Sequence, residues 1–317
     1  MDQLAQLKKM TVVVADTGDV ESIAAFKPQD ATTNPSLILK ASEDARYQEY
    51  LNNAIAFSQS KAATKEEQLP WALRKVAVNF GKALLALVPG RVSTEVDAHL
   101  SFDKAATIRE AMTIMDLYAK AGVNPERILI KIAATHEGIM AAAELERQGI
   151  HCNLTLMFHF AQAQLCAEHG ITLISPFVGR IYDWYKKAMN QDFVGLDDPG
   201  VQSVMQIYNY YKKFNYSTIV MGASFRNIGQ IQALAGCDYL TISPALLKEL
   251  QETSAPLIQE LSKDAAINLS LDKVSFDEPK FRFAMNQNAM ATEKLSEGIR
   301  LFCADLKKLE QKLWELL

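Results

Sequence analysis

The sequence predicts an α/β fold, a (β/α)8 TIM barrel with an extra N-terminal segment and a long C-terminal helix. Short apolar runs rich in β-branched residues alternate with amphipathic helical stretches along most of the 317 residues, which indicates a parallel sheet. Eight such strand–helix pairs can be counted, and that number favours a sheet closed into a barrel. Beyond Ser254 the alternation stops. An open, doubly wound sheet is the alternative fold.

Each strand is predicted from a short β-branched or apolar run that stops at a turn residue. TVVVAD ends on Asp16 before Thr17-Gly18, and DATTNP ends at Asn34-Pro35, because proline disfavours helical backbone in the residue before it. The predicted strands are residues 11–16, 30–35, 91–98, 128–135, 152–158, 171–178, 217–224 and 239–244.

Helices are predicted where apolar residues recur at helical spacing between the strands. The polar stretch KAATKEEQLP separates two of them, and Pro89-Gly90 and Gly149 mark helix ends. The predicted helices are residues 36–60, 71–87, 105–121, 137–148, 161–170, the segment after Gly179-Arg180 up to Tyr211 with a break at DDPG, 225–235, 245–252 and about 290–317.

The whole chain, residues 1–317, is interpreted as one barrel domain with a C-terminal helical extension from about residue 255 to 317 packed on it. The extension begins with an irregular polar segment that contains DKVSFDEPK. Its last helix ends in LEQKLWELL, which is charged yet apolar at helical spacing. Such a pattern predicts a helix that packs on the barrel exterior. A contact with a second copy of the chain is the alternative.

Composition excludes several function classes. Hydrophobic residues make up 49% of the chain, charged residues 22%, and the formal net charge is −4, which is typical of a soluble globular protein and disfavours a nucleic-acid partner. No apolar run approaches the roughly 20 residues that span a bilayer, and the opening MDQLAQLKK lacks the apolar core of a signal peptide. We therefore expect a cytoplasmic protein with no membrane contact.

No metal and no cofactor are expected. The four cysteines are far apart and form no CxxC pair, and the five histidines include no HxH pair, so neither a zinc site nor a disulfide is indicated. Neither GxxxxGK[ST] nor GxGxxG occurs, so a nucleotide is not indicated either.

One lysine interrupts the run ILIKIAAT, residues 128–135, which otherwise reads as a fully buried strand. With a side-chain period of two, Leu129, Lys131 and Ala133 face the same way, so Lys131 points into whatever the strand encloses. Loss of hydration disfavours the charged ammonium there, and a neutral amine is a nucleophile that can form a Schiff base. The alternatives are a buried lysine held by a carboxylate or a strand-end lysine that reaches water.

Other polar residues lie near the carboxyl ends of the predicted strands, where barrel active sites form. Each alone could be a cap or a paired core residue, but with Lys131 the set predicts one polar pocket. Arg180 follows the sixth strand and Arg226 the seventh, both at helix starts, and Ser224 at the end of the seventh strand adds a hydroxyl; this favours a bound anion and hence a phosphorylated substrate. The pocket residues are Asp16, Asn34, Glu95, Lys131, Asn153, Thr155 and Ser175, and the anion-binding residues are Arg180, Ser224 and Arg226.

Two stretches carry a resemblance to a known family. DATTNPSLI, residues 30–38, and ILIKIAATHEGIMAA, residues 128–142, resemble the two characteristic motifs of transaldolases, and the second surrounds the Schiff-base lysine. The resemblance continues through STEVDA, CNLTL, ISPFVGRIYDWY, MGASFRN and the C-terminal helix. It covers essentially the whole chain and is nearest to the long, dimeric bacterial and eukaryotic form, which implies a homodimer.

The resemblance implies transfer of a dihydroxyacetone unit from a ketose phosphate, sedoheptulose 7-phosphate or fructose 6-phosphate, to an aldose phosphate, glyceraldehyde 3-phosphate or erythrose 4-phosphate, in the non-oxidative pentose phosphate pathway. Lys131 would form the Schiff base, Asp16 would take the C4 hydroxyl proton, and Glu95 with Thr155 and a water would move protons. The implied substrate-binding residues are Asn34, Asn153 and Ser175 for the dihydroxyacetone hydroxyls, Phe177 for the pocket wall, and Arg180, Ser224 and Arg226 for the phosphate.

Two other functions fit the residues. A class I aldolase acting on a sugar phosphate would use the same imine chemistry but release the ketone. A catalytically silent sugar-phosphate binding or scaffold protein would keep Lys131 merely paired with Glu95 or Asp16. Retention of the three-carbon unit without an acceptor separates the first from a transferase, and imine formation separates the second from an enzyme.

Overall fold

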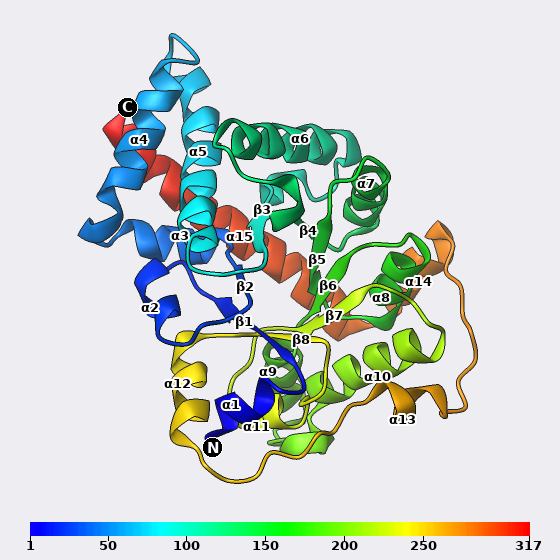
Figure 1. The fold of residues 1–317 in the computed structure, drawn as a ribbon. Coiled ribbons are helices and arrows are strands. Elements are labelled where there is room, and N and C mark those ends of the chain that lie inside the picture. The colour runs from blue at the N-terminus through cyan, green and yellow to red at the C-terminus, as the bar shows by residue number, and fades with distance from the viewer.

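The computed structural model describes residues 1–317 apart from the side chain of Ser22. Eight parallel strands form a closed barrel in chain order, with helices around it (Figure 1). The predicted barrel is confirmed, and the doubly wound alternative is wrong because β1 pairs with β8. The strands are Val12–Asp16 (β1), Asp30–Thr32 (β2), Val92–Glu95 (β3), Ile128–Ala133 (β4), Cys152–Met157 (β5), Leu173–Pro176 (β6), Ile219–Gly222 (β7) and Tyr239–Ile242 (β8).

Most helices of the N-terminal half begin at side-chain caps, for example Asn34 before α3 and Thr135 before α7, which satisfy free N–H groups of the first turn. They are α1 (Gln3–Leu7), α2 (Val20–Ala24), α3 (Pro35–Ser42), η1 (Ala45–Tyr47), α4 (Gln48–Gln59), α5 (Lys65–Leu85), η2 (Ala98–Leu100), α6 (Lys104–Lys120), η3 (Pro125–Arg127) and α7 (His136–Arg147).

The second half continues the pattern around the barrel and then leaves it. Its helices are α8 (Phe160–Glu168), α9 (Gly179–Met189), η4 (Gly195–Asp197), α10 (Pro199–Lys213), α11 (Ile228–Gln232), α12 (Pro244–Glu252), α13 (Lys263–Ile267), α14 (Glu278–Gln287) and α15 (Ala289–Leu316). No helix within the described part of the chain is both long and apolar enough to cross a membrane.

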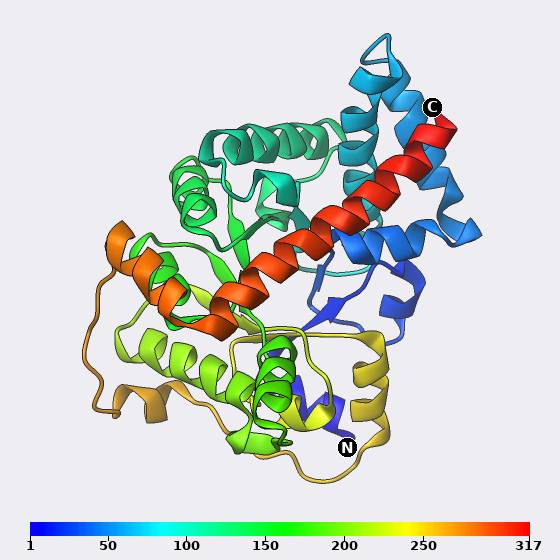
Figure 2. The same ribbon diagram turned by 180° about the vertical axis from the view of Figure 1, so that it is seen from behind.

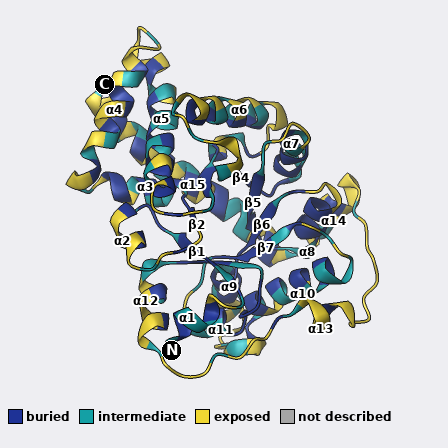
Figure 3. Ribbon diagram, viewed as in Figure 1, coloured by how far each residue is buried: buried dark blue, intermediate teal, exposed yellow. Residues whose placement is uncertain are grey.

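Two hydrophobic layers hold the barrel together. The strands are buried while the outer helix faces are exposed (Figure 3), because the outward strand side chains pack against the helices. Inside the barrel a small separate cluster of Val14, Leu129, Leu173 and Met221 fills the lower part. Polar side chains follow these residues two positions later on three of the four strands, so the apolar cluster forms the floor of a polar chamber.

The last helix, α15, crosses the carboxyl-terminal mouth of the barrel (Figure 2). It contacts α9 and β5 near its start and α5, α4 and α3 further along. Asn288 caps its first turn, and the side chains of Ile299, Phe302, Leu309 and Leu313 are buried beneath it. The long C-terminal helix that the sequence predicted is present, and its position over the mouth brings it next to the polar chamber.

Several predicted boundaries were wrong. Thr64 caps α5 at Lys65, so this helix begins six residues before the predicted position and includes Pro70 near its start. The helix predicted over 36–60 is broken near Asp44, whose side chain caps η1. The strand predicted over 91–98 ends at Glu95, because Asp97 caps η2. Helix α14 was not predicted, because it lies within a polar, Pro-containing segment.

Strand β5 contains an irregularity that strict alternation could not predict. Its register with β6 shifts between Leu154 and Met157, and Leu156 has a φ of 54°, in the left-handed region that non-glycine residues seldom adopt. A strict side-chain period of two would place Met157 on the inner face with Asn153 and Thr155. Met157 instead belongs to the same core cluster as Leu154 and Leu156, because an extra residue in a strand reverses the alternation.

Candidate active site

Lys131 lies inside the barrel, as predicted. Its inward neighbour on β4 is Leu129 of the floor cluster, and only 5% of Lys131 is exposed. The Lys131 Nζ donates a hydrogen bond of 3.1 Å to the carbonyl oxygen of Thr33 and lies 3.3 Å from Glu95 Oε2. The lysine is therefore buried and paired but aimed at the chamber, where a substrate carbonyl can reach it.

Glu95 is next to Lys131 because the two residues are register partners on β3 and β4. Burial raises the pKa of the Glu95 carboxyl, and the positive charge of Lys131 opposes this shift. Among the residues that the structure describes, Thr155 Oγ1 is buried without a hydrogen-bond partner, whereas Glu95 Oε2 is buried and held by its 3.3 Å ion pair with Lys131. A small molecule in the chamber can supply the partner that the Thr155 hydroxyl lacks, since buried polar atoms normally have one.

Asp16 ends β1 and faces the same chamber. The Thr32 hydroxyl donates a hydrogen bond of 3.0 Å to Asp16 Oδ1. Burial raises the pKa of the Asp16 carboxyl, whereas Lys131, the Thr32 hydroxyl and Arg180 act in the opposite direction. A carboxylate with a raised pKa is suited to take a proton from a substrate hydroxyl.

Asn153 and Ser175 form a connected pair on β5 and β6. The Ser175 hydroxyl donates to Asn153 Oδ1 at 2.6 Å, and Asn153 Nδ2 donates to the Ser93 hydroxyl at 3.0 Å. These bonds fix the amide orientation and leave the lone pairs of Ser175 Oγ available to a ligand hydroxyl. Asn34 lies at the chamber as well, although its Oδ1 caps α3 by accepting from the Leu37 N–H.

The predicted anion-binding residues lie together at one end of the chamber. The Arg180 guanidinium stacks between the rings of Phe177, at 5.1 Å, and Phe302, at 5.7 Å. Its Nη1 is buried with no hydrogen-bond partner in the described part of the molecule. Arg226 donates to the Asp183 carboxylate at 2.7 Å and 3.0 Å, so its charge is already partly neutralised. Ser224 lies beside Arg226.

These residues enclose a cavity of about 180 Å³. Nine of the eleven predicted site residues line it, and Glu95 and Asn153 lie directly behind the lining. No group of three or more metal-ligating side chains is placed to hold a metal ion within the residues described here. The cavity walls include Asp16, Asn34, Lys131, Thr155, Ser175, Phe177, Arg180, Ser224, Arg226, Thr32, Thr241 and Phe302.

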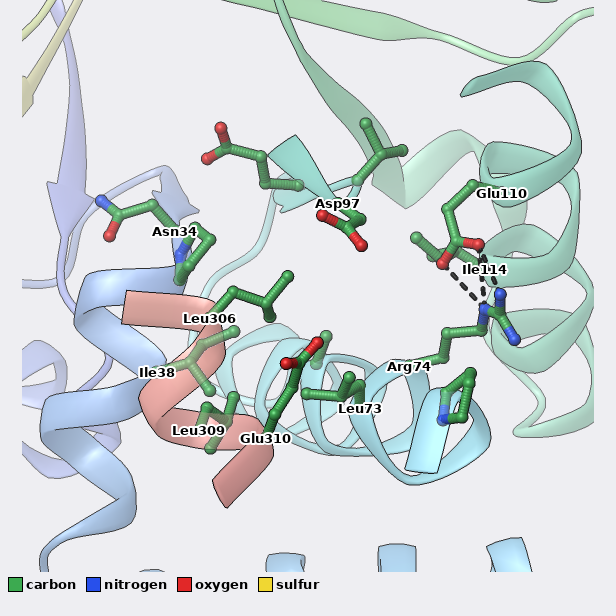
Figure 4. Close-up of a pocket in the computed structure, with 15 residues that line it drawn as sticks. Asn34, Ile38, Leu73, Arg74, Asp97, Glu110, Ile114, Leu306, Leu309 and Glu310 are labelled. Carbon is green, nitrogen blue, oxygen red and sulfur yellow. Dashed lines mark hydrogen bonds and ion pairs between the residues drawn. The ribbon is translucent and has the colours of Figure 1, made fainter. Parts of the chain in front are cut away.

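A second cavity, of about 150 Å³, has Glu95 in its lining and shares Asn34 with the first cavity; Figure 4 shows this second cavity. It is enclosed by α3, α5, α6 and α15 and is largely apolar. Arg74 and Glu110 close one side through a two-pronged ion pair of 2.7 Å and 2.8 Å. The amine and the anion-binding groups lie in the first cavity, so the chemistry belongs there.

The sequence did not single out four neighbours of the site. Thr32, Thr241 and Ser93 support Asp16 and Asn153 from below, and Phe302 covers Arg180 from α15. Ser93 lies two residues before Glu95 on β3 and therefore on the same strand face, which was a usable signal. The position of Phe302 depends on how α15 crosses the barrel, and no local pattern carries that information.

Comparison with known proteins identifies the family of the chain. The family model described as "Transaldolase/Fructose-6-phosphate aldolase" matches residues 13–313. The transaldolase of Marinomonas sp. (strain MWYL1) is 55% identical over 316 residues, covering 100% of this chain and 99% of that protein. The transaldolase of Homo sapiens is 56% identical over 314 residues, covering 98% of this chain and 93% of that protein. The chain therefore belongs to the transaldolase family, the transferases of the pentose phosphate pathway.

Proposed function

We propose that the chain transfers a dihydroxyacetone unit from sedoheptulose 7-phosphate or fructose 6-phosphate to glyceraldehyde 3-phosphate or erythrose 4-phosphate through a Schiff base on Lys131. The observation that carries this proposal is a buried amine, 3.3 Å from a buried carboxylate, in a cavity whose other end holds the unpartnered Nη1 of Arg180. The amine suits a ketone, and the guanidinium suits a phosphate.

Imine formation needs proton transfers at two atoms, the lysine nitrogen and the oxygen of the former C2 carbonyl. Lys131 as the neutral amine attacks the C2 carbonyl, and the resulting carbinolamine loses its hydroxyl as water. Glu95 is placed to receive a proton from the nitrogen and return one to the departing hydroxyl, with Thr155 and a water completing the path. The ion pair of Glu95 Oε2 with Lys131 and the buried, partnerless Thr155 Oγ1 support this role, because a bound water would supply the hydrogen-bond partner that Thr155 lacks.

Carbon–carbon cleavage then needs a base for the C4 hydroxyl. The protonated imine withdraws the electron pair of the C3–C4 bond, the C4 hydroxyl loses its proton to Asp16, and the aldose phosphate leaves. The three-carbon enamine remains on Lys131 until an acceptor aldehyde arrives. We propose that Asn34, Asn153 and Ser175 hold its hydroxyls and delay its release.

The phosphate would lie at the Arg180 end of the cavity. Arg180 stacks on Phe177 and keeps one guanidinium N–H group free, which supports its role as the main phosphate ligand. Ser224 and Arg226 would add further hydrogen bonds. The pairing of Arg226 with Asp183 predicts that its contribution is the smaller of the two arginines.

We also propose how the chain is organised. Residues 1–317 would work as one barrel domain, with the extension from about 255 to 317 completing the site through α15. A homodimer is supported by large apolar side chains left exposed on α15, namely Leu301, Trp314 and Leu316. A cytoplasmic location is supported by the four unpaired cysteine thiols.

Replacement of the lysine tests the proposal. Lys131→Arg keeps a positive charge near Glu95 but cannot form an imine, so we expect transferase turnover to disappear while circular dichroism and the unfolding midpoint remain near those of the parent protein. Lys186→Arg, on the exposed face of α9, is the control and should retain activity. Substantial turnover by Lys131→Arg would remove Lys131 from its role.

A further inference from the structure

The hydroxyl groups of two threonines, Thr32 and Thr241, form a row that ends at Asp16. The strands β8, β1 and β2 are neighbours in the barrel, and Thr241 of β8 and Thr32 of β2 flank the inner face of β1. Their hydroxyl oxygens are 2.8 Å apart, and the Thr32 hydroxyl is 3.0 Å from Asp16 Oδ1. Both threonines are nearly inaccessible to water, at 4% and 2% exposure.

The direction of these hydrogen bonds follows from the number of protons. A threonine hydroxyl has one proton to donate, and the proton of Thr32 goes to the Asp16 carboxylate, which only accepts. The Thr32 oxygen must therefore accept from Thr241. The chain runs from Thr241 to Thr32 to Asp16, and each donor polarises the next. A donor aimed at a carboxylate favours its charged form.

Other charges act on Asp16 from across the cavity. Lys131 on β4 and Arg180 on α9 favour the carboxylate, whereas the Glu95 carboxylate on β3 is a like charge that opposes it. Burial also opposes ionisation. A carboxylate that acts as a base at this position therefore needs nearby hydrogen-bond donors to stay ionised. The Thr241–Thr32 pair, on the two strands next to β1, supplies one such donor, the Thr32 hydroxyl.

We propose that Thr241, acting through Thr32, is a positioning residue that keeps the Asp16 carboxylate ionised and oriented for proton transfer. The inference rests on the proposed role of Asp16 as the base for cleavage. It assigns to Thr241 a function through another side chain, in addition to its place in the cavity wall.

Near-isosteric variants test this chain of hydroxyls. Thr32→Val should move the titration of Asp16 upward by about one pH unit, the effect of losing one hydrogen bond to a charged group. Thr241→Val should move it in the same direction by about a third of a unit, because only the polarisation of Thr32 is lost. Thr241→Ser keeps the hydroxyl and should restore the parent value. Thr94→Val, which removes a buried hydroxyl bonded to Tyr118 outside the cavity, is the matched control.

Two readouts separate the inference from the proposed function. The carboxyl titration of Asp16 is followed by NMR of protein labelled with ¹³C-aspartate and assigned with Asp16→Asn. Single-turnover release of aldose phosphate from fructose 6-phosphate is followed against pH. Parallel shifts in both, absent in Thr94→Val, support the inference and the base role together.

The other outcomes are equally informative. An unmoved carboxyl titration in Thr32→Val and Thr241→Val would overturn the inference and leave the base role standing. A shifted titration with an unchanged cleavage profile would support the inference while removing Asp16 as the base. A rise in KM for Thr241→Val without any shift would mean direct substrate contact and would overturn the inference.

Discussion

The close packing of α15 over the site can be tested by adding one methyl group to this helix, at Gly298. Gly298 is buried on the lower face of α15, and a Cβ placed there would lie 2.7 Å from Leu156 Cδ2 and 3.2 Å from Arg180 Nη1. Leu156 is fully buried, so its Cδ2 has little free space to move into within the packed core. Gly298→Ala should therefore lift α15 and displace the Arg180 guanidinium.

Two opposing terms set the size of the effect on stability. Overpacking of a filled core costs about 1–3 kcal/mol, and replacing glycine with alanine inside a helix stabilises by about 1 kcal/mol. The free energy of unfolding should thus fall by about 0–2 kcal/mol. Activity should suffer more, with KM for fructose 6-phosphate rising up to about tenfold as the hydrogen bonds to the phosphate lengthen.

The assay pairs urea unfolding with steady-state kinetics. Ala304→Gly, at an exposed position of the same helix, changes helix propensity without a contact and should leave KM unchanged. Leu156→Ala combined with Gly298→Ala should recover part of the lost affinity, because it removes the atom in contact. A Gly298→Ala protein that is stabilised by about 1 kcal/mol with unchanged KM would refute the close approach of α15.

Two further predictions concern charges in the cavity. Burial raises the pKa of the Asp16 carboxyl, so the contribution of Asp16 to the free energy of unfolding is greatest below its unfolded-state pKa and is lost as pH rises through its folded-state pKa. In urea unfolding, Asp16→Asn should therefore stabilise the protein more at pH 8 than at pH 5. The reverse order would contradict the raised pKa. Arg180→Ala should raise KM for phosphorylated donors by about 10-fold to 100-fold. Arg226→Ala should raise it by at most about fivefold, because the exposed ion pair with Asp183 already partly neutralises the charge of Arg226. Equal losses with a non-phosphorylated donor would argue against phosphate binding by either arginine.

The barrel could be predicted because parallel strands leave a strong local pattern. Each buried run of β-branched residues is followed by an amphipathic helix, and the carboxyl ends of the strands must meet at one mouth. Lys131 was identifiable because a lone lysine within ILIKIAAT contradicts the burial of its strand. Nine of the predicted site residues reach the same cavity for this reason.

What could not be predicted depends on neighbours distant in sequence. The hydroxyl of Thr241 can act on Asp16 only because it lies beside Thr32, and the closure of β8 onto β1 brings the two threonines together. Phe302 acts on Arg180 because α15 crosses the mouth. The shift in β5 breaks the alternation at Leu156, and a period-two pattern contains no signal for such an insertion.

The most direct test of the central claim is borohydride reduction of the protein in the presence of fructose 6-phosphate, followed by peptide mass mapping. We predict a reduced three-carbon dihydroxyacetone adduct on Lys131, which would establish the imine and the retention of the donor fragment in one experiment. An adduct on another lysine, or none, would contradict the account and return Lys131 to a structural pairing with Glu95.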